Sequence, residues 1–167
     1  MSKTEEYLQS AFAGESQANR KYLFFADQAE KDGFKQLARL FRAAADAETV
    51  HARNHLKVLE GIKSTKENLQ AAIDGENHEF TEMYPGFISQ AEADGAPKAK
   101  DSFELANEVE EIHHSLFTSF MEKLDKDEEI EVKPIFVCQY CGNTVEGEAP
   151  EKCPVCGVSK KMFKSID

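Results

Sequence analysis

The chain has 167 residues, a length that suits one medium-sized domain or one domain with a small appendage. Its 31 acidic residues against 20 basic ones give a net charge of −11, which argues against nucleic-acid binding because neutralising phosphates needs a basic face. The start, "MSKTEEYLQS", lacks the apolar core of a signal peptide, and no apolar run approaches the ~18–20 residues that a membrane span needs. We therefore expect a soluble cytoplasmic protein.

Residues 4–124 are rich in Ala, Leu, Phe, Glu, Lys and Gln, most of which favour helix. Breaks fall at Gly33, at Gly61 and at Gly95-Ala96-Pro97, where glycine ends helices well and proline begins them well. The joins at the first and last of these breaks are very short, so the helices on either side should be antiparallel neighbours. The sequence therefore predicts four long helices, near residues 4–32, 34–60, 66–94 and 97–124.

The helical region repeats itself. The segment "LQSAFAGES" at 8–16 matches "LQAAIDGEN" at 69–77, which is 61 positions later, whereas "AEKDG" at 29–33 matches "AEADG" at 91–95, which is 62 positions later. One residue is therefore gained in the second half, around "YPG" at 84–86. Two helix–turn–helix halves predict a pseudo-twofold four-helix bundle, and the proline inside the third helix predicts a kink or π-bulge there.

Acidic residues interrupt the apolar seam of every predicted helix at mid-length. Burying unpaired carboxylates is very costly, so either these side chains face solvent or a divalent metal offsets their charge. The four interruptions lie at equivalent positions along the four helices and follow the repeat, so we favour the alternative in which a metal offsets their charge. Ferritin-like di-iron proteins have this pattern: one Glu from each of two helices and Glu-x-x-His from each of the other two. Such ligands suit iron or manganese, with zinc as a substitute. The pattern comprises Glu15, Glu76, Glu48 with His51, and Glu110 with His113.

Glu79 is a seventh candidate ligand, one helical turn beyond Glu76. It has no counterpart in the repeat, which places Ala18 at the equivalent position. We expect it to bind one metal in one oxidation state and to release that metal in the other, in competition with a neutral histidine. Three histidines remain. We expect His55 to be packed in the core on the second helix, and His78 and His114 to face outward.

The segment "DKDEEIEVKP", residues 125–134, is a charged linker to a tail of different composition, residues 135–167. Two C-x-x-C pairs with 11 residues between them predict a four-thiolate metal site rather than disulfides. So short a tail cannot fold on its own apolar core, so the metal is structural. The spacing alone favours a zinc ribbon, but "CPVCG", Phe136 and Phe163 resemble rubredoxin, and this resemblance implies iron. The four ligands are Cys138, Cys141, Cys153 and Cys156.

The motifs "AFAGES", "AETVH", "GENHEFTEMYP" and "VEEIHH", followed by "CQYCG" and "CPVCG", occur together in this order. In this combination the chain resembles the rubrerythrin family over residues 4–167. The resemblance implies a mainly α fold: a ferritin-like four-helix bundle at 1–124, the linker at 125–134, and a rubredoxin-like four-cysteine domain at 135–167.

The resemblance also implies three iron ions per chain, one pair in the bundle and one in the tail. His51 is expected to replace Glu79 on one iron in the reduced state. Tyr22 and Tyr84 match tyrosines of the family that hydrogen-bond the site carboxylates, and Phe80 departs from a position where tyrosine is common. The implied di-iron ligands are Glu15, Glu48, Glu76, Glu79, Glu110 and His113, together with His51.

The function implied by the resemblance is a cytoplasmic peroxidase of the NADH peroxidase type that reduces hydrogen peroxide to water. The tail iron would relay electrons from a rubredoxin, a flavoprotein or an NAD(P)H-linked reductase. Three alternatives remain open at this point: an oxidase acting on dioxygen, a ferroxidase that stores iron, and a zinc-ribbon interaction module without enzymatic activity.

The resemblance implies a head-to-tail homodimer, and helix geometry favours one. His113 precedes Leu124 by 11 residues, so the site lies roughly 17 Å from the bundle end at about 1.5 Å per residue. A tail domain beyond that end would be poorly placed for its own site and better placed for a partner's. The linker could nevertheless span roughly 33 Å when extended, so folding back onto the same chain stays open.

Overall fold

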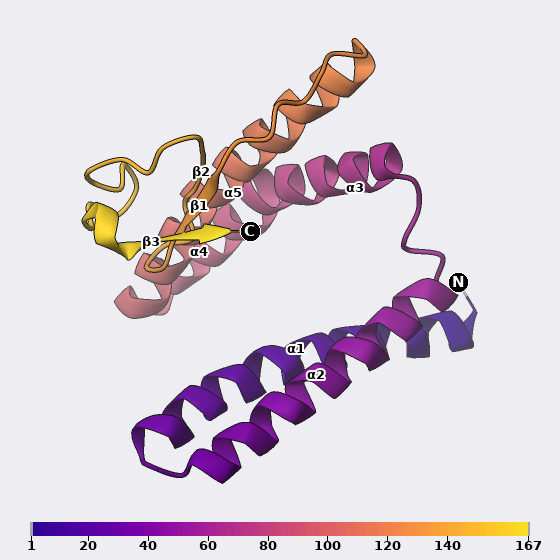
Figure 1. Ribbon diagram of the computed structural model, residues 1–167, viewed down its shortest axis with the longest axis vertical. Helices are drawn as coiled ribbons and strands as arrows, with labels where there is room; N and C mark the ends of the chain where they lie inside the picture. The colour runs from indigo at the N-terminus through magenta and orange to yellow at the C-terminus, as the bar shows by residue number, and fades with distance from the viewer. Residues whose placement is uncertain (1, 167) are drawn as a thin grey trace. The chain divides into compact units, whose positions relative to one another are not determined.

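The computed structural model describes residues 2–166, and its chain divides into two compact units between Lys63 and Ser64 (Figure 1). Met1 and Asp167, the outer ends of the two predicted domains, lie outside the described residues. The first unit is a pair of helices. The second contains the other helices and three short strands.

The first unit is a hairpin of α1 (Lys3–Lys31) and α2 (Lys35–Val58). Ser2 and Glu5 form a capping box at the start of α1, in which each side chain accepts a hydrogen bond from the other residue's backbone N–H. Gly33 reverses the chain between the helices with a φ of 86°, a conformation that favours glycine. Small side chains let the two helices approach closely, and those buried between them are Ala26, Ala29, Ala38 and Ala45.

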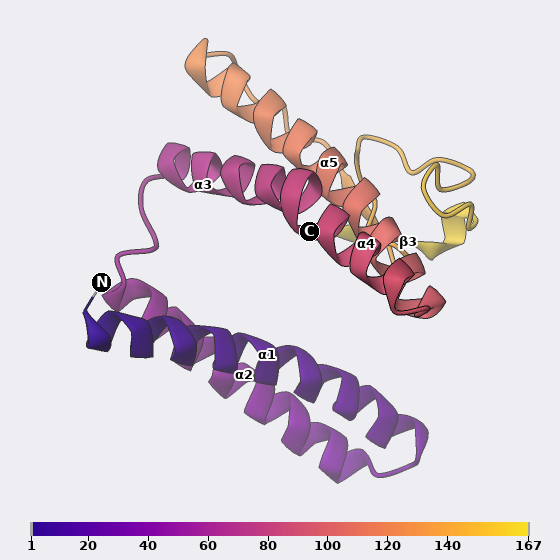
Figure 2. The ribbon, with the colours of Figure 1, turned by 180° about the vertical axis from the view of Figure 1, so that it is seen from behind.

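The helices of the second unit form an interrupted hairpin. α3 (Thr65–His78), the π-helical turn η1 (Glu79–Met83) and α4 (Tyr84–Ala93) follow one another and pack along α5 (Pro97–Asp125) (Figure 2). The π-helical turn holds the extra residue that the repeat predicts, and Pro85 follows in the first turn of α4, where its missing N–H is tolerated. The predicted kink or π-bulge is therefore confirmed.

The tail forms a small antiparallel sheet in the order β2-β1-β3. β1 (Ile135–Cys138) is the central strand, with β2 (Thr144–Glu146) on one side and β3 (Phe163–Ile166) on the other. A short 3-10 helix, η2 (Lys160–Met162), leads into the last strand. The C-x-x-C pairs lie where the chain turns after β1 and before η2.

The small sheet packs against the side of α5 in its own chain. β2 contacts α5, and a methyl group built on Gly142 would lie 3.6 Å from Val109, which is 2% exposed. Ile130 of the linker lines an apolar cleft together with Phe120 and Leu124, so the linker runs back along the helix (Figure 1). Of the two placements that the sequence leaves open, a tail domain beyond the helix end and one folded back onto its own chain, the structure has the second.

The four predicted helices agree with the observed ones to within a few residues, except that the π-helical turn interrupts the third. The predicted class, mainly α with a small four-cysteine region, is confirmed. Within residues 2–166, every helix is too short or too polar to cross a membrane.

Candidate metal centres

The first unit brings together two carboxylates and one imidazole. Glu15 comes from α1, while Glu48 and His51 lie one turn apart on α2, and one ligand atom of each lies within 4.8 Å of the others. His51 Nδ1 lies 2.8 Å from Glu48 Oε2 and 4.0 Å from Glu15 Oε1. The His51 side chain is 53% exposed, so the donors of this triplet remain accessible.

The second unit holds an equivalent triplet: Glu76 on α3, and Glu110 and His113 one turn apart on α5. His113 Nδ1 lies 2.7 Å from Glu110 Oε2 and 3.9 Å from Glu76 Oε1. The three side chains are half-buried, with exposed fractions of 17–27%. The two triplets match in residue type and in position within the repeat.

The electrostatics of the second triplet favour a cation. Burial, followed by the neighbouring Glu110 carboxylate, raises the pKa of Glu76 to about 7. Burial and the same carboxylate also raise the pKa of Glu79 above its ordinary value. A proton or a cation at these carboxyl groups relieves the repulsion between them. Oxygen and nitrogen donors in this number fit iron or manganese.

Glu79 and the two tyrosines belong to neither triplet. Glu79 lies in the π-helical turn. Tyr84 packs edge-on against Phe87, and burial together with the Glu110 carboxylate raises its pKa. Tyr22 packs against Phe41 in the first unit. Within residues 2–166 no hydrogen bond joins either tyrosine to a carboxylate, so their expected hydrogen-bonding role stays a prediction.

The other three histidines have separate surroundings. His78 is exposed and lies 3.4 Å from Glu82, in agreement with the expected outward orientation. His114 is half-buried and its ring lies 5.4 Å from that of Phe80, which differs from the expected exposure. His55 is half-buried on α2.

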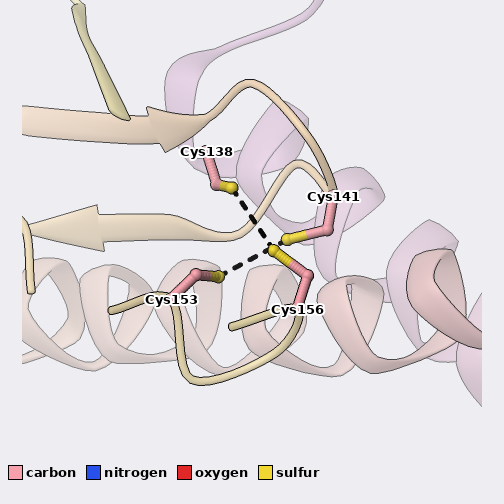
Figure 3. Close-up of side chains that lie close together, drawn as sticks. All are labelled: Cys138, Cys141, Cys153 and Cys156. Carbon is pink, nitrogen blue, oxygen red and sulfur yellow. Dashed lines mark hydrogen bonds between the residues drawn. The ribbon is translucent and has the colours of Figure 1, made fainter. Parts of the chain in front are cut away.

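The sulfur atoms of the four cysteines converge, as Figure 3 shows. The Sγ atoms of Cys138 and Cys156 are 3.7 Å apart, and those of Cys141 and Cys153 are 3.6 Å apart. A disulfide needs about 2.05 Å, whereas a tetrahedral metal with bonds of about 2.3 Å separates its sulfurs by about 3.8 Å. The cluster therefore has the dimensions of a four-thiolate metal site.

Backbone hydrogen bonds favour the ionised form of one of these thiols, that of Cys153. Burial opposes ionisation of Cys153, but the backbone N–H groups of Cys156 and Val155 outweigh it and lower the pKa of Cys153 to about 7. Burial instead raises the pKa of Cys141. A bound cation would favour the thiolate form of every cysteine that coordinates it.

Two residues next to the cluster were not predicted from the sequence. Asn143 is 1% exposed, and its Nδ2 donates to Cys153 Sγ at 3.6 Å. The next residue, Thr144, places Oγ1 2.9 Å from His113 Nε2. The only sequence signal for them is a polar pair directly after "CQYCG", which by itself does not say what either side chain contacts.

Comparisons with known proteins agree with this geometry. A family described as "Rubrerythrin" matches residues 6–121, and its "Rubrerythrin, rubredoxin-like domain" matches residues 136–164. The chain is 35% identical to "Rubrerythrin-2" of Clostridium acetobutylicum, covering 98% of this chain and 96% of that one. It is 37% identical to "Rubrerythrin" of Nitratidesulfovibrio vulgaris, covering 99% and 95%. The solved structure "Fully reduced state of nigerythrin (all ferrous)" matches with a TM-score of 0.59 and 32% identity, covering 99% and 88%.

Proposed function

The chain belongs to the rubrerythrin family, and from this premise we propose that it reduces hydrogen peroxide to water. As a member it is an oxidoreductase, and its triplets and cysteine cluster match the iron centres of the family. The observation that carries the proposal is the contact between the four-cysteine domain and the second triplet, where Thr144 Oγ1 lies 2.9 Å from His113 Nε2. An electron carrier beside a carboxylate site suits repeated reduction of a small oxidant.

In this proposal the two triplets and Glu79 hold two irons, and the four cysteines hold a third. When bound, the iron pair supplies Lewis acidity and two electrons for cleavage of the O–O bond, and the four-thiolate iron supplies replacement electrons singly. As the family resemblance implies, Glu79 and His51 would be alternative ligands to one of these irons. The exposure of His51 and the position of Glu79 in a π-helical turn support such an exchange.

Glu79 also suits the delivery of protons. Reduction of one hydrogen peroxide consumes two protons and two electrons and yields two waters. Burial and the Glu110 carboxylate favour the protonated form of Glu79 when it is free of metal. A Glu79 carboxyl group that leaves a metal can therefore hold a proton on one carboxylate oxygen and donate it to the oxygen that leaves as water.

The reductant and the assembly are further parts of the proposal. We expect electrons to come from a rubredoxin, a flavoprotein or an NAD(P)H-linked reductase, and the chain to form a head-to-tail homodimer, as the family resemblance implies. Light scattering of the purified protein tests the dimer, and reconstitution with each class of donor tests the electron source.

An oxidase acting on dioxygen is the second candidate. A cavity of about 290 Å³ lies beside Glu76 and His113, and its lining surface is mostly apolar, with Leu116 and Phe117 among the contributors. Such a lining suits an apolar gas as well as a small neutral peroxide. Iron storage is less well supported, because it gives the four-cysteine domain no role.

Rapid mixing separates these functions. Iron-loaded protein is reduced without air and then mixed with hydrogen peroxide or with dissolved oxygen, and the red colour of the oxidised four-thiolate iron is followed. We expect fast colour recovery with peroxide and slow recovery with oxygen. Faster recovery with oxygen would favour the oxidase. No recovery, from protein with iron at both kinds of site, would refute the proposed function.

A further inference from the structure

Thr144 joins the four-cysteine domain to the second triplet. It is the first residue of β2, three positions after Cys141, and it pairs with Val137 of the central strand. Its Oγ1 lies 2.9 Å from His113 Nε2 and 3.1 Å from the carbonyl oxygen of Gly142. Thr144 and His113 also line the same cavity. The hydroxyl thus lies between a cysteine-bearing loop and a candidate metal ligand.

A count of protons fixes the direction of these hydrogen bonds. A threonine hydroxyl has one proton, and the Gly142 carbonyl can only accept it. Thr144 Oγ1 must then accept from His113, which requires the imidazole proton to be on Nε2. Nδ1 of this tautomer carries a lone pair and lies 2.7 Å from Glu110 Oε2, a distance at which the two atoms share a proton or a metal ion, with Glu76 Oε1 at 3.9 Å. Three acceptors that converge in this way suit a shared cation.

The equivalent histidine of the first unit provides an internal contrast. His51 has the same Nδ1 contact with a glutamate, at 2.8 Å, but among the described residues of its own unit, 2–63, its Nε2 has no hydrogen-bond partner. Its side chain is 53% exposed, against 27% for His113. The repeat therefore supplies the ligands of both triplets, and the four-cysteine domain contacts the triplet of its own unit.

We propose that Thr144 is a positioning residue that holds the Nε2–H form of His113 and thereby links metal occupancy of the cysteine cluster to metal affinity of the second triplet. The inference rests on the proposed role of this triplet as a metal site. A domain this small needs its metal to fold, so Thr144 is in place only when the cluster is filled. By thermodynamic linkage, filling either site strengthens the other.

The hydrogen bond is tested by NMR on full-length protein that holds zinc in the cysteine cluster and no metal in the triplets. The expected signature is an Nε2–H resonance of His113 that is protected from solvent exchange, assigned with a His113→Gln variant. Thr144→Val, which keeps the shape but removes the hydroxyl, should abolish the protection, and Thr144→Ser should restore it. His51 should be unchanged in all variants. Protection that persists in Thr144→Val would overturn the proposal.

The linkage is tested by titrating the same protein with manganese(II) alone and following the free ion by EPR. We expect about tenfold weaker binding when the cysteine cluster is empty, and a similar loss in Thr144→Val with the cluster filled. Emptying the cluster of Thr144→Val should cause no further loss. Equal affinities throughout would overturn the proposal. Cobalt(II)–thiolate absorption reports whether each variant's small domain folds, and Thr144→Ala replaces Thr144→Val if that variant does not.

These measurements use no peroxide. A protein with the expected NMR signature and linkage but no reaction with peroxide would refute the proposed function while leaving the role of Thr144 intact.

Discussion

Asn143 and Thr144 are neighbours whose side chains serve different centres, as expected where successive residues of an extended chain point to opposite sides. Thr144 reaches His113, and Asn143 donates to Cys153 Sγ from a position that is 1% exposed. A donor to a thiolate stabilises the more negative, reduced state of a four-thiolate iron, because that state carries more charge on its sulfurs.

Asn143→Leu should therefore lower the reduction potential of the cysteine-bound iron. A net hydrogen bond contributes about 1 kcal/mol, which at 59 mV per tenfold corresponds to a decrease of at most about 40 mV. Redox titration of the visible absorption measures it. Gln139→Leu is the matched control, since Gln139 lies beside Cys138 but donates to the Val137 carbonyl on the surface. An unchanged potential in Asn143→Leu would mean that the amide fills space without affecting the sulfur.

Glu76 predicts a pH dependence of the metal-free protein. Its pKa is about 7 in the folded chain against an ordinary value of 4.5, so the folded state binds this proton more tightly than the unfolded state does. The contribution of Glu76 to the free energy of unfolding is thus greatest at low pH and decreases as pH rises from about 4.5 to about 7. Glu76→Gln cannot ionise and should lack this decrease. Urea unfolding of both proteins at the two ends of the window measures the difference, and parallel curves would contradict the assignment.

The triplet residues could be predicted from the sequence because Glu-x-x-His at i and i+3 and the repeat are local patterns. The hydrogen bond between Thr144 and His113 could not be predicted in this way. Thr144 lies 31 positions away, and the contact depends on where the small sheet packs on α5. Similarly, nothing in "CGNTV" indicates that Asn143 is buried against a sulfur rather than exposed in a turn.

At the scale of elements, the helices begin and end near the predicted residues because capping residues and glycines mark them. The interruption of the third helix was predicted, but its position was not. The repeat places the gained residue near residues 84–86, whereas the π-helical turn lies at Glu79–Met83 and includes a hydrogen bond from Tyr84 N–H to the Glu79 carbonyl. A proline shows that the helix is disturbed, but it does not show which preceding turn takes up the extra residue.

Two glycines of the first hairpin should respond oppositely to alanine. Gly33 has a φ of 86°, so Gly33→Ala should decrease the free energy of unfolding by about 1–2 kcal/mol. Gly14 lies within α1 with nothing within 4 Å of an added Cβ, so Gly14→Ala should increase it by roughly 0.5–1 kcal/mol. Chemical unfolding followed by helical circular dichroism measures both. The same sign for the two substitutions would contradict the assigned turn.

At the scale of the whole molecule, residues 2–166 contain two equivalent triplets and one cysteine cluster, and each centre has charge suited to its cation. A triplet of two carboxylates and one imidazole offsets a divalent ion, and each unit contains one. The duplication of the triplets can be predicted from the sequence repeat. The position of the four-cysteine domain against α5 could not be predicted, because the length of a linker limits how far the domain can reach but not in which direction.

Zinc substitution tests whether the centres work together. Full-length protein with zinc in the cysteine cluster and reduced iron at the carboxylates should consume about one peroxide per iron pair and then stop, because zinc keeps the tetrahedral site but carries no electrons. The Thr144–His113 contact should persist, since the domain remains folded around its metal. Peroxide consumption with an excess of electron donor measures this against the all-iron protein, which should continue to turn over. Equal turnover by the two proteins would mean that electrons reach the carboxylate site without the cysteine cluster.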